Sequence, residues 1–449
     1  MRLWLPVAHL YHGSYFGDRY TQPEQSHVRI KEGLLSGNVY VTGIGMVTPL
    51  GLDTRSTWEA LLQGKSGIAP ITAFDTKGFE TTIAGEVKGF DPTAYTDRKQ
   101  ARRLDRFAQL AVAATAQALE QANLKLDDPS IDATRVGSVI GSGIGGIMTL
   151  SEQWAVLAEK GPSRVNPFLV PMMLADMAPG QVSILFGAKG PNYCTVTACS
   201  SGADSIGIAS HMIRSGEVDI AIAGGTEAPI VPIAVAGFNA CMALTKRNDD
   251  PSGASRPFDA GRDGFVMGEG AGILILESEE SVARRGVTPI AELAGYGASS
   301  DAYHVTQPAP DGEGASRAIA KAFAEANLDP SDVGYINAHG TSTPMNDRLE
   351  TAAIKASFGA EAYKVMVSST KSMTGHMLGA AGGVEAAITV LAVSEGKIPP
   401  TINLTTADPD CDLDYTPNHA RTLPINAAMS NNLGFGGHNA SLIFRKVTS

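Results

Sequence analysis

The sequence has little cysteine and few aromatic residues, and each shortage excludes a class of protein. Its 449 residues include only 4 cysteines, none in C-x-x-C spacing, which excludes a disulfide framework and favours a reducing cytoplasm. Aromatic residues make up 6%, whereas glycine occurs 49 times, which indicates many tight turns. The composition therefore predicts a large globular α/β protein rather than a fibrous or disordered chain.

Positive charge is also scarce. The formal net charge is −11, which excludes general nucleic-acid binding because phosphate neutralisation requires dominant clusters of Lys and Arg. An acidic protein partner is compatible with this charge where the surface offers a local basic patch. One short segment offers such a patch, with Arg98, Lys99, Arg102, Arg103 and Arg106. The segment is either a docking surface or an ordinary solvated face.

Long uninterrupted apolar runs are missing too. The most apolar stretch, residues 220–244, is broken by glycines, prolines and Glu227, so no membrane span is expected. Residues 1–37 have little periodicity and no clear cap or turn before an apolar strand opens at Val39. We expect them to be an N-terminal extension that is disordered or not native, such as an overextended reading frame.

Apolar segments alternate with alanine-rich amphipathic segments along the rest of the chain. Strands are predicted at residues 38–47, 135–143, 219–225, 272–278, 333–340 and 440–446. Helices are predicted at residues 106–124 and 314–328. This alternation is typical of an α/β protein with buried central sheets.

Two parts of the chain repeat each other. The segment ALEQANL at residues 118–124 is echoed by AFAEANL at residues 322–328, and each precedes an Asp- and Pro-containing turn and a strand that opens Val-Gly. We expect two diverged copies of one unit, at residues 38–287 and 288–449. Paired halves commonly form a site where their strand ends meet.

Cys199 is the first candidate for chemistry. The strand-like segment 193–198 runs directly into this cysteine, and a segment with helical spacing follows. The order predicts a sharp turn that places the thiol at a helix N-terminus, where free N–H groups favour a reactive thiolate. The alternative is a small buried apolar residue, which is our interpretation of Cys194, Cys241 and Cys411.

Three further glycine-rich segments carry functional side chains. His339 follows a predicted strand and precedes three hydroxyl residues, so its imidazole can point into a cleft. Residues 368–382 contribute Lys371 and His376, and residues 430–439 form the third segment. Each segment alone is also compatible with a structural turn.

Four motifs occur in a fixed order along the chain. They are TACSS, HGTST, KSMTGHMLGAAG and NNLGFGGHN, at residues 197–201, 339–343, 371–382 and 431–439. Together they resemble the signature set of the β-ketoacyl-acyl carrier protein synthases, over a match from Val39 to the C-terminus. The resemblance implies an α/β fold of the thiolase-like type, a duplicated five-layer αβαβα arrangement. The two histidines are similar to those of the elongating Cys-His-His members, most of all the synthase II type.

The resemblance also implies a reaction, the decarboxylative condensation of an acyl thioester with a malonyl thioester. Cys199 is then the acylated nucleophile, and His339 and His376 stabilise the enolate that forms when CO2 leaves. The backbone amides of Cys199 and Phe435 form the oxyanion hole.

Further residues match positions with roles in the family. Lys371 completes the catalytic set and pairs there with a glutamate that matches Glu350, in a segment that begins at Asp347. The alternative for this pair is a salt bridge on a helix surface, worth ~0–1 kcal/mol. The residues matched to substrate binding are Ile144, Thr306, Thr341, Thr343 and Phe435, with Phe435 as a gate and Ile144 at the end of the acyl pocket.

The family's partner is the acyl carrier protein, in its acyl and malonyl forms, and its members form homodimers that complete the acyl pocket. We expect the same here, with no metal, no organic cofactor, no nucleic acid and no membrane.

Three other interpretations are compatible with parts of the sequence. Residues 141–146 satisfy G-x-G-x-x-G, but the motif lies far from the start of the chain and no acidic residue follows at the required strand end, which disfavours a dinucleotide-binding oxidoreductase. A non-catalytic chain-length subunit lacks the cysteine that is present here. Synthase I and polyketide ketosynthases are not separated from synthase II by these motifs.

Overall fold

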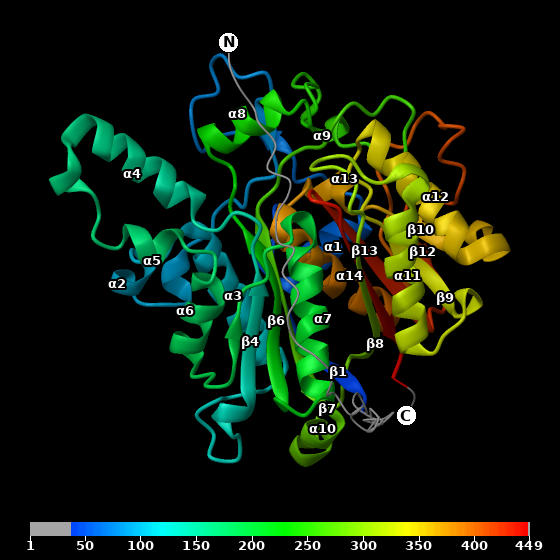
Figure 1. Cartoon of the computed structure of the whole chain (residues 1–449), viewed down its shortest axis with the longest axis horizontal. Helices are drawn as coiled ribbons and strands as arrows, with labels where there is room; N and C mark the ends of the chain where they lie inside the picture. The colour runs from blue at the N-terminus through cyan, green and yellow to red at the C-terminus, as the bar shows by residue number, and fades with distance from the viewer. Residues whose placement is uncertain (1–36, 448–449) are drawn as a thin grey trace, which may run out of the picture. The chain divides into compact units, whose positions relative to one another are not determined.

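The structure, a computed structural model, describes residues 37–447. Within this range the strands of the main sheet follow the order β10-β9-β13-β14-β8-β1-β7-β6-β4-β5 (Figure 1). The strands of the first half are β1 Val39–Val47, β4 Val136–Gly141, β5 Asn192–Tyr193, β6 Ile220–Glu227 and β7 Gly270–Ser278. Those of the second half are β8 Ala291–Ser300, β9 Val333–Asn337, β10 Met366–Ser368, β13 Ala427–Gly434 and β14 His438–Arg445.

The two half-sheets repeat one topology, which confirms the predicted duplication. In the first half β4 is parallel to β5 and β6, whereas β7 is antiparallel to both β6 and β1. In the second half β9 is parallel to β10 and β13, whereas β14 is antiparallel to both β13 and β8. The halves are joined where β1 pairs with β8 in antiparallel fashion.

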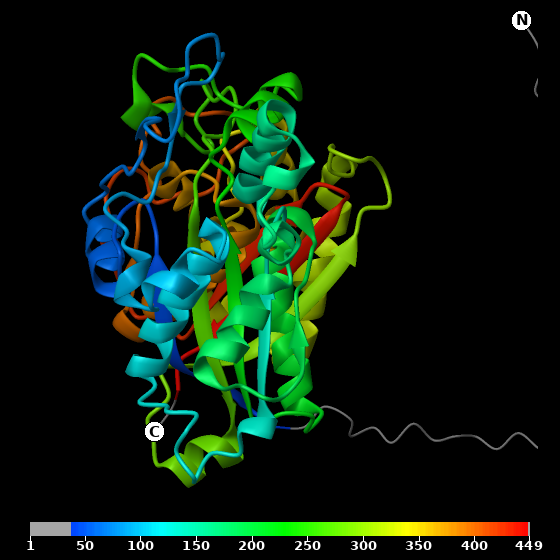
Figure 2. The ribbon, with the colours of Figure 1, turned by 90° about the vertical axis from the view of Figure 1, so that its left-hand side faces the viewer.

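Helices cover both faces of each half-sheet. The central layer consists of α7, Ser201–Arg214, and α14, Ala381–Glu395, which contact each other and both half-sheets. The helices α3, Arg106–Gln121, and α6, Met177–Phe186, cover the outer face of the first half (Figure 2). The helices α11, Glu313–Ala326, and α12, Pro344–Phe358, lie on the opposite side. This is the expected five-layer αβαβα arrangement.

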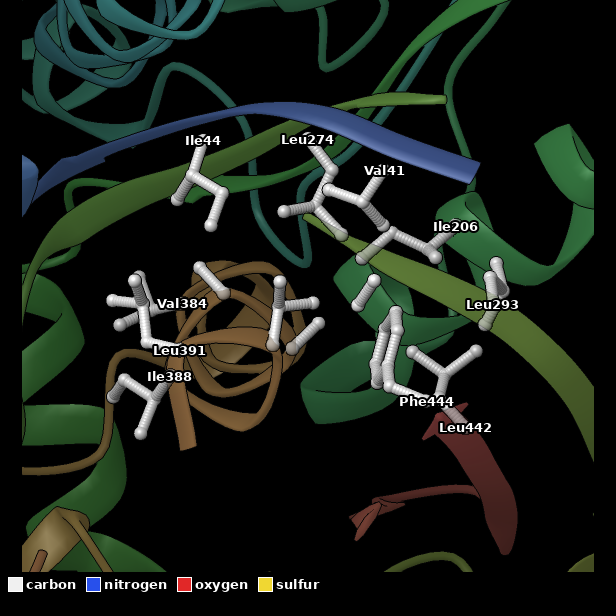
Figure 3. Close-up of a cluster of buried hydrophobic side chains, with 14 of the residues drawn as sticks. Val41, Ile44, Ile206, Leu274, Leu293, Val384, Ile388, Leu391, Leu442 and Phe444 are labelled. Carbon is white, nitrogen blue, oxygen red and sulfur yellow. The ribbon is translucent and has the colours of Figure 1, made fainter. Parts of the chain in front are cut away.

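The hydrophobic core is centred on α14. Figure 3 shows Val384, Ile388 and Leu391 of this helix beside Ile44 of β1 and Leu274 of β7. By length and composition, residues 378–395 are the one described segment apolar enough to cross a membrane, and 83% of it is buried inside the protein. Burial on all sides explains why this helix has no polar face.

Shorter elements complete the chain. The helices are α1 Thr54–Leu62, α2 Arg98–Ala101, α4 Ile147–Lys160, α5 Leu169–Met173, α8 Pro232–Ala240, α9 Pro251–Ala254, α10 Glu279–Arg285 and α13 Lys371–Thr374. Two small ribbons are β2 Ala69–Pro70 with β3 Ile83–Ala84, and β11 Lys397–Ile398 with β12 Arg421–Thr422. The helix α4 projects from the body of the protein (Figure 1), and Thr149 is its one buried residue.

Each strand and helix predicted from periodicity is present, with ends that differ by a few residues. The strand-like interpretation of residues 193–198 is wrong, because β5 ends at Tyr193 and the chain then turns toward Cys199. Residues 430–439 are not a loop but the tip of the β13–β14 hairpin. The strand β13 was overlooked because both of its faces are buried and carry the polar residues Ser430, Asn431 and Asn432, which break the apolar pattern.

The predicted boundary between the halves falls in the connection between α10 and β8, and it stays a prediction. The N-terminal extension lies outside the described residues except for Gly37.

Candidate active site

A cavity of about 330 Å³ opens where strand ends from the two halves meet. Its walls come from the turns after β4 and β9, from the 3-10 turn that precedes α7 and from the β13–β14 hairpin. The residues predicted from sequence that line it are Ile144, Cys199, Thr306, Thr341, Thr343, His339, His376 and Phe435. The fold therefore brings together residues that are more than half the chain apart.

Cys199 lies in a single 3-10 turn, Ala198–Ser200, directly before α7, so the predicted turn is present at the helix start. Ala198 has φ 51°, a left-handed conformation that costs about 1–3 kcal/mol in a residue other than glycine. The hairpin packs tightly against this turn: a Cβ added to Gly434 would lie 2.7 Å from the Thr197 carbonyl oxygen. Glycine at this position lets the hairpin backbone approach the cysteine.

Two histidines surround the thiol. The Nε2 atom of His376 lies 3.0 Å from the Sγ atom of Cys199. The ring of His339 is 5.2 Å from the His376 ring, centroid to centroid, and nearly perpendicular to it at 89°. Both histidines are buried, with 3% of each side chain exposed. An acyl group on the sulfur would therefore lie within reach of two imidazoles.

Both histidines are neutral in this environment. Burial lowers the pKa of His339 and of His376 well below the usual value, and the nearby charge of Lys371 lowers both further. Within residues 37–447 neither Nδ1 atom has a hydrogen-bond partner. A neutral imidazole can donate one N–H to a developing oxyanion or accept one proton, so these rings are suited to both tasks.

The resting form of Cys199 is the thiol, which corrects the expectation that the helix start makes it a thiolate. Burial raises the pKa of the Cys199 thiol to about 12, while the Lys371 charge and a hydrogen bond from the Phe435 backbone oppose the rise. The cost of burying the anion is the largest of these effects. The thiol proton therefore needs an acceptor, and the adjacent His376 nitrogen is in place.

Lys371 pairs with a different glutamate from the one predicted. Its Nζ atom contacts the Oε1 atom of Glu385 on α14, and each of these side chains is 1% exposed. The other carboxylate oxygen of Glu385 accepts a hydrogen bond from Asn432 at 2.7 Å. The predicted pairing with Glu350 is wrong. The helix α14 follows α13 closely in the chain and places the Glu385 carboxylate against Lys371.

Glu350 instead holds the turn that carries His339. Its carboxylate accepts hydrogen bonds from the backbone N–H groups of His339 and Gly340, both at 2.7 Å. Burial raises the pKa of Glu350 to about 7, against these two hydrogen bonds. Glu350 therefore does not form a salt bridge on the surface. It holds the backbone of this turn in place and so positions His339.

Asp347 lies outside the cavity and supports another loop. It accepts a hydrogen bond from the backbone N–H of Phe258 at 2.9 Å and is 3.5 Å from the Arg262 guanidinium. The side chain is fully buried.

The mouth of the cavity is formed by two loops that hold each other. The N–H of Gly436 donates to the Val305 carbonyl at 2.7 Å, and the N–H of Asp301 donates to the Gly437 carbonyl at 2.8 Å. Phe435 stands at the tip of the hairpin with 37% of its surface exposed. Thr306 comes directly after Val305 on the other loop. Phe435 and Thr306 therefore both line the entrance to the cavity.

Glu227 was not identified from the sequence. It ends β6, is fully buried, and accepts four hydrogen bonds from turns that line the cavity. A signal that could have identified it is a lone charged residue at the end of an apolar strand. Such a charge is buried only when it is paired or hydrogen-bonded.

Comparison with known proteins identifies the family. The family description "Beta-ketoacyl synthase, N-terminal domain" matches residues 37–281, and "Beta-ketoacyl synthase, C-terminal domain" matches residues 290–405. The chain is 53% identical over 408 residues to the 3-oxoacyl-[acyl-carrier-protein] synthase 2 of Synechocystis sp., covering 91% of this chain and 98% of that protein. The same figures hold for the synthase 2 of Staphylococcus aureus strain N315.

Solved structures agree with this similarity. The ishigamide ketosynthase/chain length factor matches with a TM-score of 0.86 at 36% identity, over 92% of this chain and 100% of that chain. A beta-ketoacyl synthase from Burkholderia phymatum matches over the same shares with a TM-score of 0.85 at 36% identity. The thiolase-like fold and the synthase II resemblance expected from sequence are thus confirmed. By motif order, duplicated fold and similarity over nearly its whole length, the chain belongs to the beta-ketoacyl synthase family.

Proposed function

We propose that the protein is a 3-oxoacyl-[acyl-carrier-protein] synthase of the synthase 2 type. It joins an acyl group to the carbon skeleton of malonyl carrier protein and releases CO2 and free carrier protein. The observation that carries the proposal is the 3.0 Å contact between Cys199 Sγ and His376 Nε2, beside a second neutral histidine that lines the same cavity. Identity to synthase 2 proteins is 53%, against 36% to the solved ketosynthases named above.

The first half-reaction transfers the acyl group to the enzyme. The Cys199 proton passes to Nε2 of His376, and the sulfur attacks the carbonyl carbon of the acyl thioester. The negative oxygen of the tetrahedral intermediate is bound by the backbone N–H groups of Cys199 and Phe435. When the C–S bond to the carrier breaks, the carrier thiolate takes up the proton and leaves, and acyl-Cys199 remains.

The second half-reaction forms the carbon–carbon bond. The malonyl carboxylate leaves as CO2, and its bonding electrons form an enolate on the thioester. Hydrogen bonds from the neutral imidazoles of His339 and His376 stabilise the enolate oxygen. The enolate carbon attacks the carbonyl of acyl-Cys199, and the C–S bond to the enzyme breaks. The departing Cys199 thiolate takes up one proton from solvent, which regenerates the resting thiol. These residues supply the chemistry without a metal or an organic cofactor.

Residues 141–146 do not act as a dinucleotide-binding loop in this proposal. In such a loop the backbone N–H groups bind phosphate oxygens. Here the N–H groups of Gly143 and Ile144 donate to the Glu227 carboxylate, so the position of an anion is already taken.

The direct test of the function uses acyl carrier proteins that bear acyl groups of several lengths, together with malonyl carrier protein. We expect CO2 release and a 3-oxoacyl product lengthened by the acetyl unit of malonyl, detected by mass spectrometry. Ile144 lines the same cavity as Cys199 and is proposed to bound the acyl pocket. Absence of product with every chain length would overturn the proposal.

The partner in this reaction is an acyl carrier protein, and we propose that it docks on the basic patch at α2. One similar solved structure is that of a ketosynthase with its acyl-carrier protein, at 36% identity and a TM-score of 0.84. Arg106 is not free to contribute, because its guanidinium is bonded to Glu269. The exposed members of the patch are Arg98, Lys99, Arg102 and Arg103.

Reversing two charges of this patch, in the variant Lys99→Glu/Arg102→Glu, should raise the KM for acyl carrier protein about 10-fold or more, because electrostatic attraction to the acidic partner becomes repulsion. The KM for a small acyl thioester without the carrier should not change. The control is Lys125→Glu/Lys189→Glu, which alters the net charge equally at exposed lysines elsewhere. Equal effects of the two variants would contradict docking at α2.

The protein is further proposed to form a homodimer through the face made by α4, α5, α6 and β5. Exposed apolar side chains concentrate there: Leu150, Trp154, Leu157, Phe168, Val170, Leu174, Ile184, Tyr193 and Val196. Such a concentration is typical of an interaction surface. The strand β5 is also an edge of the main sheet.

Trp154, which is 70% exposed, tests the dimer. Trp154→Asp should shift the protein from dimer to monomer by light scattering, because burying a carboxylate in an apolar interface is unfavourable. The control Tyr363→Asp changes an exposed aromatic residue, 59% exposed, away from this face. A monomeric parent protein, or an unchanged mass for Trp154→Asp, would exclude this interface.

A further inference from the structure

Glu227 binds two turns that approach it from opposite halves of the protein. Its Oε1 atom accepts from the Ser142 hydroxyl at 2.8 Å and from the Ile144 N–H at 3.1 Å. Its Oε2 atom accepts from the Gly143 N–H at 2.6 Å and from the Gly379 N–H at 3.0 Å. The carboxylate thus has four donors and fills its hydrogen-bonding capacity.

These two turns form adjoining walls of the cavity. The turn after β4 carries Ile144, and the turn that contains Gly379 follows His376 and carries Leu378, which also lines the cavity. Their close approach depends on glycine. A Cβ on Gly379 would lie 2.3 Å from the Gly143 nitrogen and 2.6 Å from Glu227 Oε2. No larger residue fits between the carboxylate and the two backbones.

The other half of the protein contains a corresponding arrangement. Glu350 accepts the N–H groups of His339 and Gly340, in the turn after β9, and β9 is the repeat counterpart of β4. One buried glutamate therefore holds each of the two strand-end turns. In the second half the held turn carries a proposed catalytic histidine. In the first half it carries Ile144, the proposed boundary of the acyl pocket.

The negative charge of Glu227 opposes formation of the Cys199 thiolate, which the proposed reaction needs. The carboxylate is one of the groups that raise the pKa of Cys199, after the larger effect of burial. A group that only filled space at this position would be less costly as an uncharged residue. Burial raises the pKa of the Glu227 carboxyl and the four donors oppose that rise, so the role of the carboxylate lies in the turns that it connects.

We propose that Glu227 is a positioning residue that sets the width of the acyl end of the cavity, and thereby the selectivity among acyl chain lengths. It does so by fixing Ile144 relative to Leu378 across the boundary between the halves. This inference depends on the proposed synthase activity, because selectivity is defined only for an enzyme that accepts acyl groups. Glu227 does not touch the reacting atoms and acts through the two turns.

The test is the variant Glu227→Gln, assayed for acyl transfer to Cys199 by intact-protein mass spectrometry with acyl carrier proteins of short and long chains. The amide places N–H donors against backbone N–H groups, so at least one turn must move. We expect the ratio of kcat/KM values for long and short chains to change by about 10-fold or more. An unchanged ratio would overturn the inference.

The matched control is Glu277→Gln. Glu277 is also fully buried. At the opposite end of β7, which pairs with β6, it accepts from Thr42 and Ser281 and forms an ion pair with Arg285. A merely structural glutamate should reduce the rates for all chains by the same factor, and this is the expected control result. Equal shifts of the ratio in both variants would also contradict the proposal.

A second variant keeps the test decisive should Glu227→Gln fail to fold by circular dichroism. Ser142→Ala removes one of the four donors and leaves the carboxylate in place, so we expect a shift of the ratio in the same direction but smaller. An unshifted ratio in folded Ser142→Ala would then overturn the inference. If the parent protein itself forms no acyl-enzyme, the proposed function fails, which is distinguishable from an active parent whose selectivity ignores Glu227.

Discussion

Cys199→Ala is expected to abolish acyl transfer and condensation while malonyl decarboxylation continues. The alanine removes the sulfur that forms the thioester, so condensation should fall on the order of 1000-fold or more. His339 and His376 remain, and their neutral imidazoles can still stabilise the enolate that CO2 loss creates. Mass spectrometry of the enzyme after incubation with acyl carrier protein measures the first effect, and CO2 release from malonyl carrier protein measures the second.

Cys194→Ala is the control for this experiment. Cys194 is only partly buried and does not line the cavity, and burial raises the pKa of its thiol to about 11. Its removal should leave the acyl-enzyme intact. An acylated Cys199→Ala protein would contradict the assignment, because the acyl group would then be on another residue.

Removing Lys371 is expected to affect both stability and the pH profile. Lys371→Met leaves Glu385 buried without a counter-charge, which should lower the free energy of unfolding by about 3–5 kcal/mol. The double variant Lys371→Met/Glu385→Gln removes both charges and should recover most of that stability in a denaturant titration. It should not recover the activity of the parent protein, because the Lys371 charge also acts on the histidines.

The pH profile separates the effect of Lys371 on the histidines from its effect on stability. Burial, and then the Lys371 charge, lower the pKa of His339 and His376, so removing the charge raises the pKa of both. The neutral rings needed for enolate stabilisation are protonated as pH falls through their pKa. The acid limb of the kcat/KM profile should therefore move to higher pH in the stable double variant. If the acid limb of the double variant coincides with that of the parent protein, Lys371 has a structural role only.

The chemical groups of the site could be predicted from sequence because each lies at a local feature. Cys199 precedes a helix, His339 follows a strand, and Lys371 and His376 lie in a glycine-rich turn, so near neighbours in the chain suffice to indicate them. The duplication was visible for the same reason, as a repeated helix end and turn.

The partners of these groups could not be predicted in this way. Lys371 pairs with Glu385 rather than Glu350, and Glu227 joins residues from both halves. Lys371 and Glu385 lie on different helices 14 residues apart, and Gly379 is 152 residues from Glu227, so no local pattern encodes these contacts. The strand β13 was missed because it carries buried polar residues. Asn432 bonds to Glu385 and Asn431 bonds to Ser441, and only the folded chain brings these partners near.

The sequence by itself thus determined the fold class, the repeat and the side chains that are proposed to react, since strand and helix ends with their glycines are local properties. Only the tertiary structure decided how those side chains are charged and held. Burial makes Cys199 a resting thiol and the two histidines neutral. It also makes the carboxylates of Glu227, Glu350 and Glu385 depend on donors that other elements of the fold supply. The physical reason is that desolvation and hydrogen bonding depend on the surroundings in space, which the chain acquires only when its two halves pack together.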